Sequence, residues 1–274
     1  MSAAREGLLL WFLTVMPSLL PFIIGINLLL GLGVLRALPP GGVAFVMGLI
    51  SGYPMGAKTV GDLCRTNEIS PEKARRLLGF CNNAGPLFIV GAVGVGMFGD
   101  IRSGYILWAG HVLGALTIAI LGRLLLGIVS DKTVKKTVFT PLPLGKVLGD
   151  AVKNAMEAMA LVGGLIILFN VAVRVVLAAT GLARDGYFAG VLGGFFEISG
   201  GARVLAAQGS NVWALALAAG VIGFGGLSVH AQALYFASGT GVRTGRYLLC
   251  KLLHGVLAAA FTVIIWFVIV GNRS

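Results

Sequence analysis

Charged side chains are scarce in this chain of 274 residues. Asp, Glu, Lys and Arg make up 11% of it, whereas about a quarter of the residues of an ordinary soluble domain are charged. Hydrophobic residues account for 57%, and the mean hydropathy is +0.95. The composition excludes a soluble globular domain and predicts an all-α polytopic protein of the cell membrane.

Acidic residues are rarer than basic ones, with 10 Asp and Glu against 21 Lys and Arg, so the net charge is +11. Such a charge can indicate a nucleic-acid partner, but the sequence has no basic stripe with interleaved aromatic residues. Lys and Arg instead concentrate in short loops, as membrane topology requires. We therefore expect the lipid bilayer as a partner and no nucleic acid.

Cysteines are few and enzyme signatures are missing. Cys64, Cys81 and Cys250 share no close spacing of the kind that binds zinc or forms a redox pair. The sequence has no HExxH, P-loop or GxSxG motif, and the GxGxxG match that begins at Gly94 follows no predicted strand. We expect no enzyme activity, no metal and no cofactor.

Two stretches interrupt apolar segments with glycine, proline and amide side chains. They are SGYPMGAK at 51–58 and CNNAGP at 81–86. Irregular backbone is tolerated at membrane depth only where it is buried in protein or lines a cavity. A degraded copy follows in the second half, with GGFFEISGGAR at 193–203 and GFGGLSVHAQ at 223–232. The sequence therefore predicts one unit present twice.

Each unit is expected to hold three transmembrane helices, one of them broken, and a re-entrant helical hairpin. A short interfacial or tilted helix at 4–16 precedes the first span. In the first unit, 1–129, we predict a span at 18–35, a hairpin at 43–63, a broken helix at 72–98 and a span at 105–128. After a cytoplasmic linker at 130–153, the second unit, 154–274, has a span at 156–179, a hairpin at 188–208, a broken helix at 212–237 and a span at 247–270.

An odd number of crossings in each unit inverts the second unit relative to the first. With the lysine-rich linker in the cytoplasm, most other basic residues also fall inside, as the positive-inside rule requires. This orientation puts both termini outside. The basic residues expected inside are Arg36, Arg65, Lys73, Arg75, Arg76, Arg243 and Arg246.

Inverted repeats with paired hairpins and broken helices are typical of secondary transporters, whose site lies near the bilayer midplane. The N-termini of half-helices carry partial positive charge and unpaired amides. The sequence thus favours alternating-access transport of a small polar anion. A nucleoside-type permease and a non-transporting membrane scaffold are the alternatives, and the oligomeric state, homo-oligomers included, stays open.

Three motifs carry a resemblance to a known family: PSLLPF at 17–22, GYPMGAK at 52–58 and CNNAGPLFIVG at 81–91. The chain resembles the sporulation integral membrane proteins of the YlbJ type, in the nucleoside-recognition or Gate domain group. The resemblance implies a nucleoside-transporter-like core, a forespore membrane location and movement of dipicolinic acid during sporulation. The chain departs from that pattern in its short linker and in GGLSVHAQ at 225–232.

A site for dipicolinate, which carries two carboxylates, needs fixed cations or oriented amides. Lys58 and Arg203 hold equivalent places in the two predicted hairpins and are the leading candidates. Alternatively, each side chain extends to the membrane interface, with Lys58 paired to Asp62. Glu197 could couple a proton or sodium ion to transport, or it could pair with Arg203.

Polar side chains at the interruptions complete the predicted site. Asn82 and Asn83 offer donors and acceptors where their helix breaks, and His230 could titrate, although a lone histidine more often packs in a core. We expect His111 and His254 to hydrogen-bond between helices. The predicted substrate-binding residues are Ser51, Gly52, Tyr53, Pro54, Lys58, Asn82, Asn83, Gly85, Ser199, Gly200, Gly201, Arg203, Ser228, His230 and Gln232.

Overall fold

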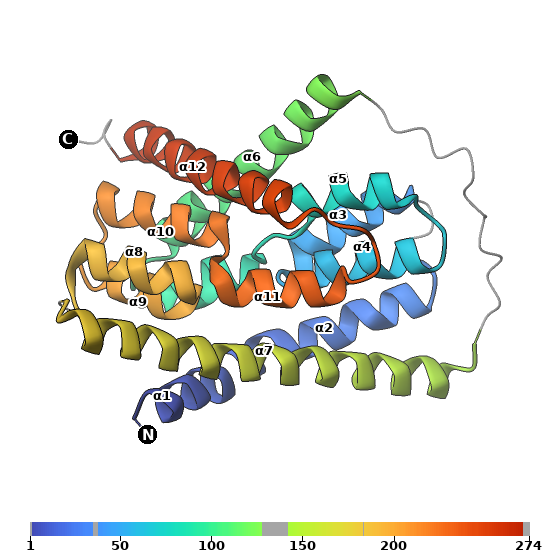
Figure 1. The fold of residues 1–274 in the computed structure, drawn as a ribbon, viewed down its shortest axis with the longest axis horizontal. Coiled ribbons are helices and arrows are strands. Elements are labelled where there is room, and N and C mark those ends of the chain that lie inside the picture. The colour runs from blue at the N-terminus through green and yellow to red at the C-terminus, as the bar shows by residue number, and fades with distance from the viewer. Residues whose placement is uncertain (1, 35–37, 128–141, 183, 271–274) are drawn as a thin grey trace.

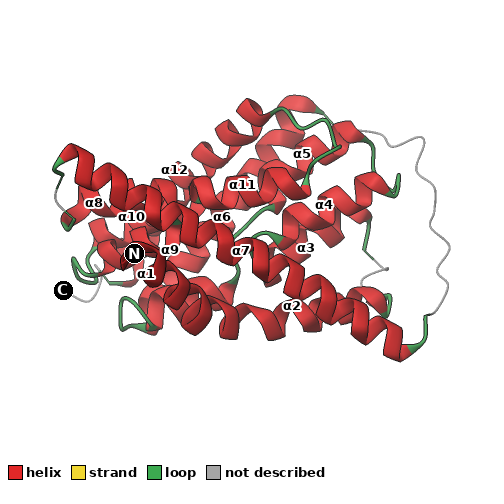
Figure 2. Ribbon diagram, turned by 60° about the horizontal axis from the view of Figure 1, so that its bottom comes forward, coloured by secondary structure: helices red, strands yellow, loops and turns green. Residues whose placement is uncertain are grey.

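The computed structural model describes residues 2–34, 38–127, 142–182 and 184–270. Every regular element in these ranges is helical (Figures 1 and 2). Four helical segments are long and apolar enough to cross a membrane, and a bent pair near the N-terminus makes a fifth candidate. The chain is therefore an all-helical, polytopic membrane protein.

The N-terminal helices bend where proline interrupts them. α1 (Ser2–Leu10) runs through a π-helical segment, η1 (Trp11–Val15), into α2 (Met16–Gly31). The helix axis turns by 53° between residues 3–15 and 19–31. Pro17 lies at this bend, where its missing N–H removes a helical hydrogen bond. Asn27 donates to the carbonyl of Ala151 at 3.2 Å and so ties α2 to the helix beside it.

A tight helical hairpin follows, made by α3 (Pro40–Ser51) and α4 (Met55–Arg65). Its two arms meet at Gly48 and Gly56, where an added Cβ would lie 1.7 Å and 1.9 Å from the carbonyl oxygen of Cys81. Glycine at both positions allows the end of the next helix to enter between the arms. The hairpin is thereby fixed against the break in that helix.

The first broken helix consists of α5 (Pro71–Cys81) and the π-helical η3 (Leu87–Val95), separated by the non-helical residues 82–85. Ser70 caps α5 by accepting from the amide of Lys73 at 3.3 Å, and Pro71 takes the first helical position. α6 (Ile101–Leu126) is capped by Asp100 and forms a full span.

α7 (Leu144–Thr180) begins earlier than the sequence analysis predicted. The predicted linker reached residue 153, but residues 144–153 form the first turns of this helix. Pro143 precedes it and favours an N-terminus there. Residues 128–141, which include positions 130–141 of the predicted linker, lie outside the described ranges.

The second half repeats the element types of the first. α8 (Gly186–Phe196) and α9 (Ile198–Ala206) form a hairpin that turns at Glu197, and α12 (Thr244–Ile269) is the last span. Between them, α10 (Val212–Phe224) and α11 (Gly226–Phe236) meet at Gly225, whose φ of 100° interrupts the helix.

The two hairpins lie at opposite ends of the long axis of the molecule, with α3 and α4 at one end and α8 and α9 at the other (Figure 1). Their packing is reciprocal: α4 contacts α11 of the second half, while α9 contacts η3 of the first. The spans also pair across the halves, α2 with α7 and α6 with α12. The turns of the two hairpins and the breaks of the two broken helices consequently lie near the centre of the molecule.

Candidate functional site

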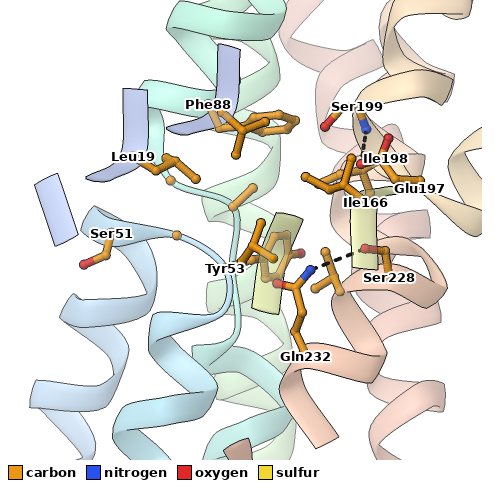
Figure 3. Close-up of a pocket in the computed structure, with 16 residues that line it drawn as sticks. Leu19, Ser51, Tyr53, Phe88, Ile166, Glu197, Ile198, Ser199, Ser228 and Gln232 are labelled. Carbon is orange, nitrogen blue, oxygen red and sulfur yellow. Dashed lines mark hydrogen bonds between the residues drawn. The ribbon is translucent and has the colours of Figure 1, made fainter. Parts of the chain in front are cut away.

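A cavity of about 50 Å³ lies where the hairpin tips and helix breaks meet (Figure 3). It is large enough for a few water molecules, each of which needs roughly 10–15 Å³ by this measure. η1, α2 and α7 close it on the remaining sides through Val15, Leu19, Val162 and Ile166. The polar side chains of the lining come from the two hairpin tips and from α11, and the break beyond α5 contributes Ala84 and Gly85.

The first hairpin tip contributes Ser51, Gly52 and Tyr53 to this lining. Gly52 has a φ of 78°, and an added Cβ would lie 2.6 Å from the amide nitrogen of Gly85 at the break beyond α5. Only glycine fits such a conformation at so close an approach. Tyr53 donates its hydroxyl to the carbonyl of Ile222 at 3.0 Å, which fastens this tip to α10 of the second half.

The second hairpin tip places a carboxylate in the cavity wall. Glu197 is 3% exposed and caps α9. Its Oε1 atom accepts from the amide of Ser199 at 2.9 Å and its Oε2 atom from that of Gly200 at 2.7 Å. The side chain thus takes the amide donors that the N-terminus of α9 would otherwise offer to an anion.

α11 supplies two neutral polar side chains to the cavity. Ser228 and Gln232 lie one helical turn apart, both are buried, and Gln232 Nε2 donates to Ser228 Oγ at 3.3 Å. Figure 3 shows this pair below Glu197 and beside the Tyr53 ring. The cavity therefore offers hydroxyl, amide and carboxylate groups within one small space.

A fully buried lysine lies behind Tyr53. Lys251 of α12 has no exposed surface, and its Nζ atom is 5.4 Å from the centroid of the Tyr53 ring. The ammonium donates to the carbonyl oxygen of Asn82 at 2.7 Å and lies 3.0 Å from His254 Nδ1. Since Asn82 directly follows α5, the positive charge sits at the negative end of that helix dipole.

Lys251 was not among the predicted site residues, because residues 247–270 were predicted to form one apolar span. The available signal was the ionisable side chain itself, since a lysine inside a transmembrane helix marks a functional candidate by default. Lys251 lies only two helical turns after the start of α12 and follows Arg243 and Arg246. The sequence alone therefore did not distinguish this buried lysine from the basic residues expected at the membrane interface.

Further hydrogen bonds join the break beyond α5 to the second half. Asn82 Nδ2 donates to the Tyr247 hydroxyl at 3.0 Å, and that hydroxyl lies 3.2 Å from His230 Nδ1. Asn82 and His230 thus belong to a polar cluster with Lys251, behind the cavity and not in its wall. Asn83 donates to the carbonyl of Phe80 at 2.7 Å and so closes the end of α5.

The prediction that His111 and His254 bond between helices is confirmed. His254 Nε2 lies 2.9 Å from the carbonyl oxygen of His111, and the two rings are 4.5 Å apart. His111 Nε2 in turn accepts from the amide of Ala84 at 3.1 Å. With Nε2 of His254 donating, its Nδ1 atom accepts from Lys251, so one tautomer satisfies both contacts.

Eight of the predicted residues line the cavity together, and others lie next to it. Pro54 is buried at the start of α4, and Gly201 packs against Gly194 between the arms of the second hairpin, where its added Cβ would be 2.3 Å from the Gly194 Cα. The cavity-lining members are Ser51, Gly52, Tyr53, Gly85, Glu197, Ser199, Ser228 and Gln232.

The structure places neither Lys58 nor Arg203 in the cavity. Lys58 Nζ lies 2.8 Å from Asp62 Oδ2, the local pairing that the sequence analysis gave as the alternative. Arg203 is exposed on α9. Each residue follows its hairpin tip by at least a helical turn, which carries its Cα more than about 5 Å from the tip along the helix. Glu197 was suggested as an ion-pair partner of Arg203, but its carboxylate accepts hydrogen bonds from the backbone amides of Ser199 and Gly200 instead.

These features define a class of protein: an integral membrane protein with a small polar cavity enclosed by interrupted helices. The chain is 33% identical to the sporulation integral membrane protein YlbJ of Bacillus subtilis (strain 168), over 96% of this chain and 77% of that protein. No model of a protein family matches the chain, and no solved structure matches it. This chain belongs to the YlbJ family of sporulation integral membrane proteins.

Proposed function

We propose that this protein is a secondary transporter that moves a small polar anion by alternating access. The observation that carries the proposal is the central cavity, because two hairpin tips, the break beyond α5 and the first turns of α11 meet around it. Secondary transporters bind substrate near the midplane between repeats, on discontinuous helices of this kind. An ordinary membrane scaffold has no need for four interruptions that meet at one point.

The proposal includes an inverted relation between residues 1–129 and 154–274. Three observations support it: hairpins at opposite ends of the molecule, reciprocal contacts of α4 with α11 and α9 with η3, and pairing of α2 with α7 and α6 with α12. A pseudo-twofold axis in the membrane plane would superpose the first half on the second, and it would convert the contact of α4 with α11 into that of α9 with η3. It would also place both termini outside, with the lysine-rich linker in the cytoplasm.

Dipicolinic acid is the substrate that we propose, following the family to which the chain belongs. The fixed positive charge comes from Lys251 in this proposal and not from Lys58 and Arg203. Tyr53 separates the ammonium from the cavity, so a shift of its ring would open the lysine to a bound carboxylate. α4 begins just after the first hairpin tip and η3 just after the break beyond α5, so both helix N-termini start beside the cavity.

The cavity in its present conformation is smaller than the roughly 300–1,000 Å³ of typical ligand sites. We therefore assign this conformation to the closed stage of the cycle, in which the first hairpin tip touches the break beyond α5. Separation of the hairpin tip at Gly52 from the helix break at Gly85 would enlarge the cavity. Glu197, in the wall of the cavity, is positioned to carry a coupling proton or sodium ion, because its carboxylate charge would favour either cation.

A nucleoside is the second candidate substrate, and one observation favours it. Among the described residues that line the cavity, none is Lys or Arg, whereas Ser51, Tyr53, Ser228 and Gln232 offer neutral hydrogen-bonding groups. The neutral base and the ribose of a nucleoside would form hydrogen bonds with these groups and would not need the ammonium of Lys251. The Tyr53 ring would then stack on the base.

Uptake into liposomes tests the proposal. Purified protein is reconstituted, and accumulation of labelled dipicolinate and labelled uridine is measured with a proton gradient, a sodium gradient or neither. We expect dipicolinate to enter faster than uridine and faster than into protein-free liposomes. Faster uridine entry would support the nucleoside candidate instead, and background rates for both solutes under every gradient would contradict transport of either.

A further inference from the structure

Two cavities outside the proposed site share a wall of arginines. The larger, of about 600 Å³, lies between α5, α6 and α12. The smaller, of about 200 Å³, reaches Tyr247 at the start of α12. Arg75, Arg76 and Arg246 line both. Neither cavity belongs to the central site described above.

The larger cavity has a strongly basic end. Five cationic side chains line it, and among its described lining residues none is acidic. Arg123 lies in the last turn of α6, and Arg246 is the third residue of α12. Both positions are at the ends of membrane-spanning helices, where headgroups lie. The five cationic residues are Lys73, Arg75, Arg76, Arg123 and Arg246.

The opposite wall of the same cavity is apolar. Leu77 and Phe80 of α5 face Ile118 and Ala119 of α6 across it. Leu121 and Leu125, which neighbour the lining residues of α6 in sequence, are 41% and 78% exposed. An apolar wall below a cluster of cations matches an amphiphilic anion better than a small soluble one.

The basic end is held in place from two sides. Arg76 Nη2 lies 2.8 Å from Glu72 Oε1, and Arg76 Nη1 donates to the carbonyl of Gly127 at 2.7 Å, just beyond α6. This second bond joins α5 to the end of α6 and fixes the width of the cavity there. The guanidinium is thereby ordered before any ligand binds, which lowers the entropy lost on binding.

We propose that the larger cavity binds an anionic phospholipid. Its phosphate lies among Arg75, Arg123 and Arg246, where planar guanidinium groups form bidentate bonds with phosphate oxygens. One acyl chain follows the apolar wall of α5 and α6. Basic pockets between transmembrane helices are known to bind anionic headgroups in this way. The bound lipid bridges α5, which carries a helix break of the central site, to α12, which carries Lys251.

Native mass spectrometry of the purified full-length protein tests this inference. The probes are phosphatidylglycerol, phosphatidylcholine of the same chain length, and inorganic phosphate. The first variant, Arg123→Gln with Arg246→Gln, removes two cations. The second, Gly122→Trp, fills the cavity without changing charge, because a Cβ at Gly122 meets no atom within 4 Å.

Two controls match these variants on α7, away from the cavity. Lys146→Gln with Lys153→Gln removes the same charge from side chains that are 57% and 74% exposed. Gly149→Trp adds the same side chain at a helical glycine whose Cβ also meets no atom within 4 Å. All variants are first checked for monodispersity and helix content, so that loss of lipid is not confused with loss of fold.

We expect the unchanged protein to retain phosphatidylglycerol in preference to phosphatidylcholine. Both cavity variants should bind phosphatidylglycerol roughly 10- to 30-fold more weakly, while both controls bind it as the unchanged protein does. Equal retention of the two lipids, or unchanged binding by both cavity variants, would overturn the proposal. Displacement of phosphatidylglycerol by inorganic phosphate at equal concentration would assign the cations to a soluble anion and overturn the lipid as occupant.

Discussion

The ammonium of Lys251 lies 2.7 Å from the carbonyl oxygen of Asn82, at the point where α5 ends. This contact joins the last span of the second half to the helix break of the first. It places a buried charge where the backbone of α5 has unpaired carbonyls. The helix break that contributes Ala84 and Gly85 to the cavity is therefore also the element that holds the lysine.

The bond from Tyr53 to Ile222 should stabilise the closed arrangement of the first hairpin. Tyr53→Phe removes a buried hydroxyl that donates at 3.0 Å, and we expect a loss of about 1 kcal/mol in stability. Thermal unfolding in mild detergent measures this change. Tyr235→Phe is the control, because Tyr235 is 64% exposed on α11. Equal unfolding temperatures for the two variants would show that the bond does not hold the hairpin.

Glu197 should matter for coupling more than for folding. Glu197→Gln is isosteric and keeps an oxygen that can accept from the amide of Ser199 or Gly200, but it carries no charge. We expect exchange of labelled for unlabelled dipicolinate to continue in liposomes, whereas gradient-driven accumulation is lost. Glu157→Gln on the exposed side of α7 is the control. Accumulation by the Glu197 variant at the unchanged rate would remove Glu197 from the coupling step.

The second hairpin should depend on glycine where its arms touch. At Gly201 an added Cβ would lie 2.3 Å from both the Cα and the amide nitrogen of Gly194, so the arms must separate to admit it. We expect Gly201→Ala to lower stability by about 1–3 kcal/mol. Gly164→Ala on α7 meets no atom within 4 Å and should be neutral or slightly stabilising. A Gly201 variant as stable as the Gly164 variant would contradict the close packing.

Membrane topology can be tested by labelling single cysteines from each side. We replace Cys64, Cys81 and Cys250 by Ala, and introduce Thr66→Cys at the end of α4 or Gln208→Cys after α9. An inverted arrangement puts these two positions on opposite sides of the bilayer. A membrane-impermeant maleimide added to intact cells should label one and spare the other. Labelling of both from the outside, or of neither, would contradict inversion.

The sequence indicated the interruptions well, because glycine and proline act locally. Gly52, Glu197 and Gly225 end helices inside or next to the segments that were predicted to be irregular, and the order Ser70, Pro71, Glu72 is a local signal for the cap of α5. All of these are short-range effects of backbone conformation and capping. They could be predicted without knowledge of the packing.

The direction of side chains could not be predicted in the same way. Lys58 and Lys251 both occur in helices near a hairpin or span end, yet one pairs with Asp62 locally and the other is buried against Asn82. The difference depends on how α4 and α12 are rotated against their neighbours, which is a property of tertiary packing. The early start of α7 is a similar case, since its polar first turns carry no apolar signal of a span.

Dipicolinate uptake by liposomes that contain the Lys251→Gln variant tests the central claim most directly. Glutamine can still donate to Asn82 but carries no charge, so helix packing should persist and be visible as unchanged thermal stability. If Lys251 provides the charge that binds the transported anion, initial uptake falls roughly thirtyfold or more, whereas Lys146→Gln leaves it unchanged. Uptake by the folded Lys251→Gln protein at the rate of the unchanged protein would contradict the account.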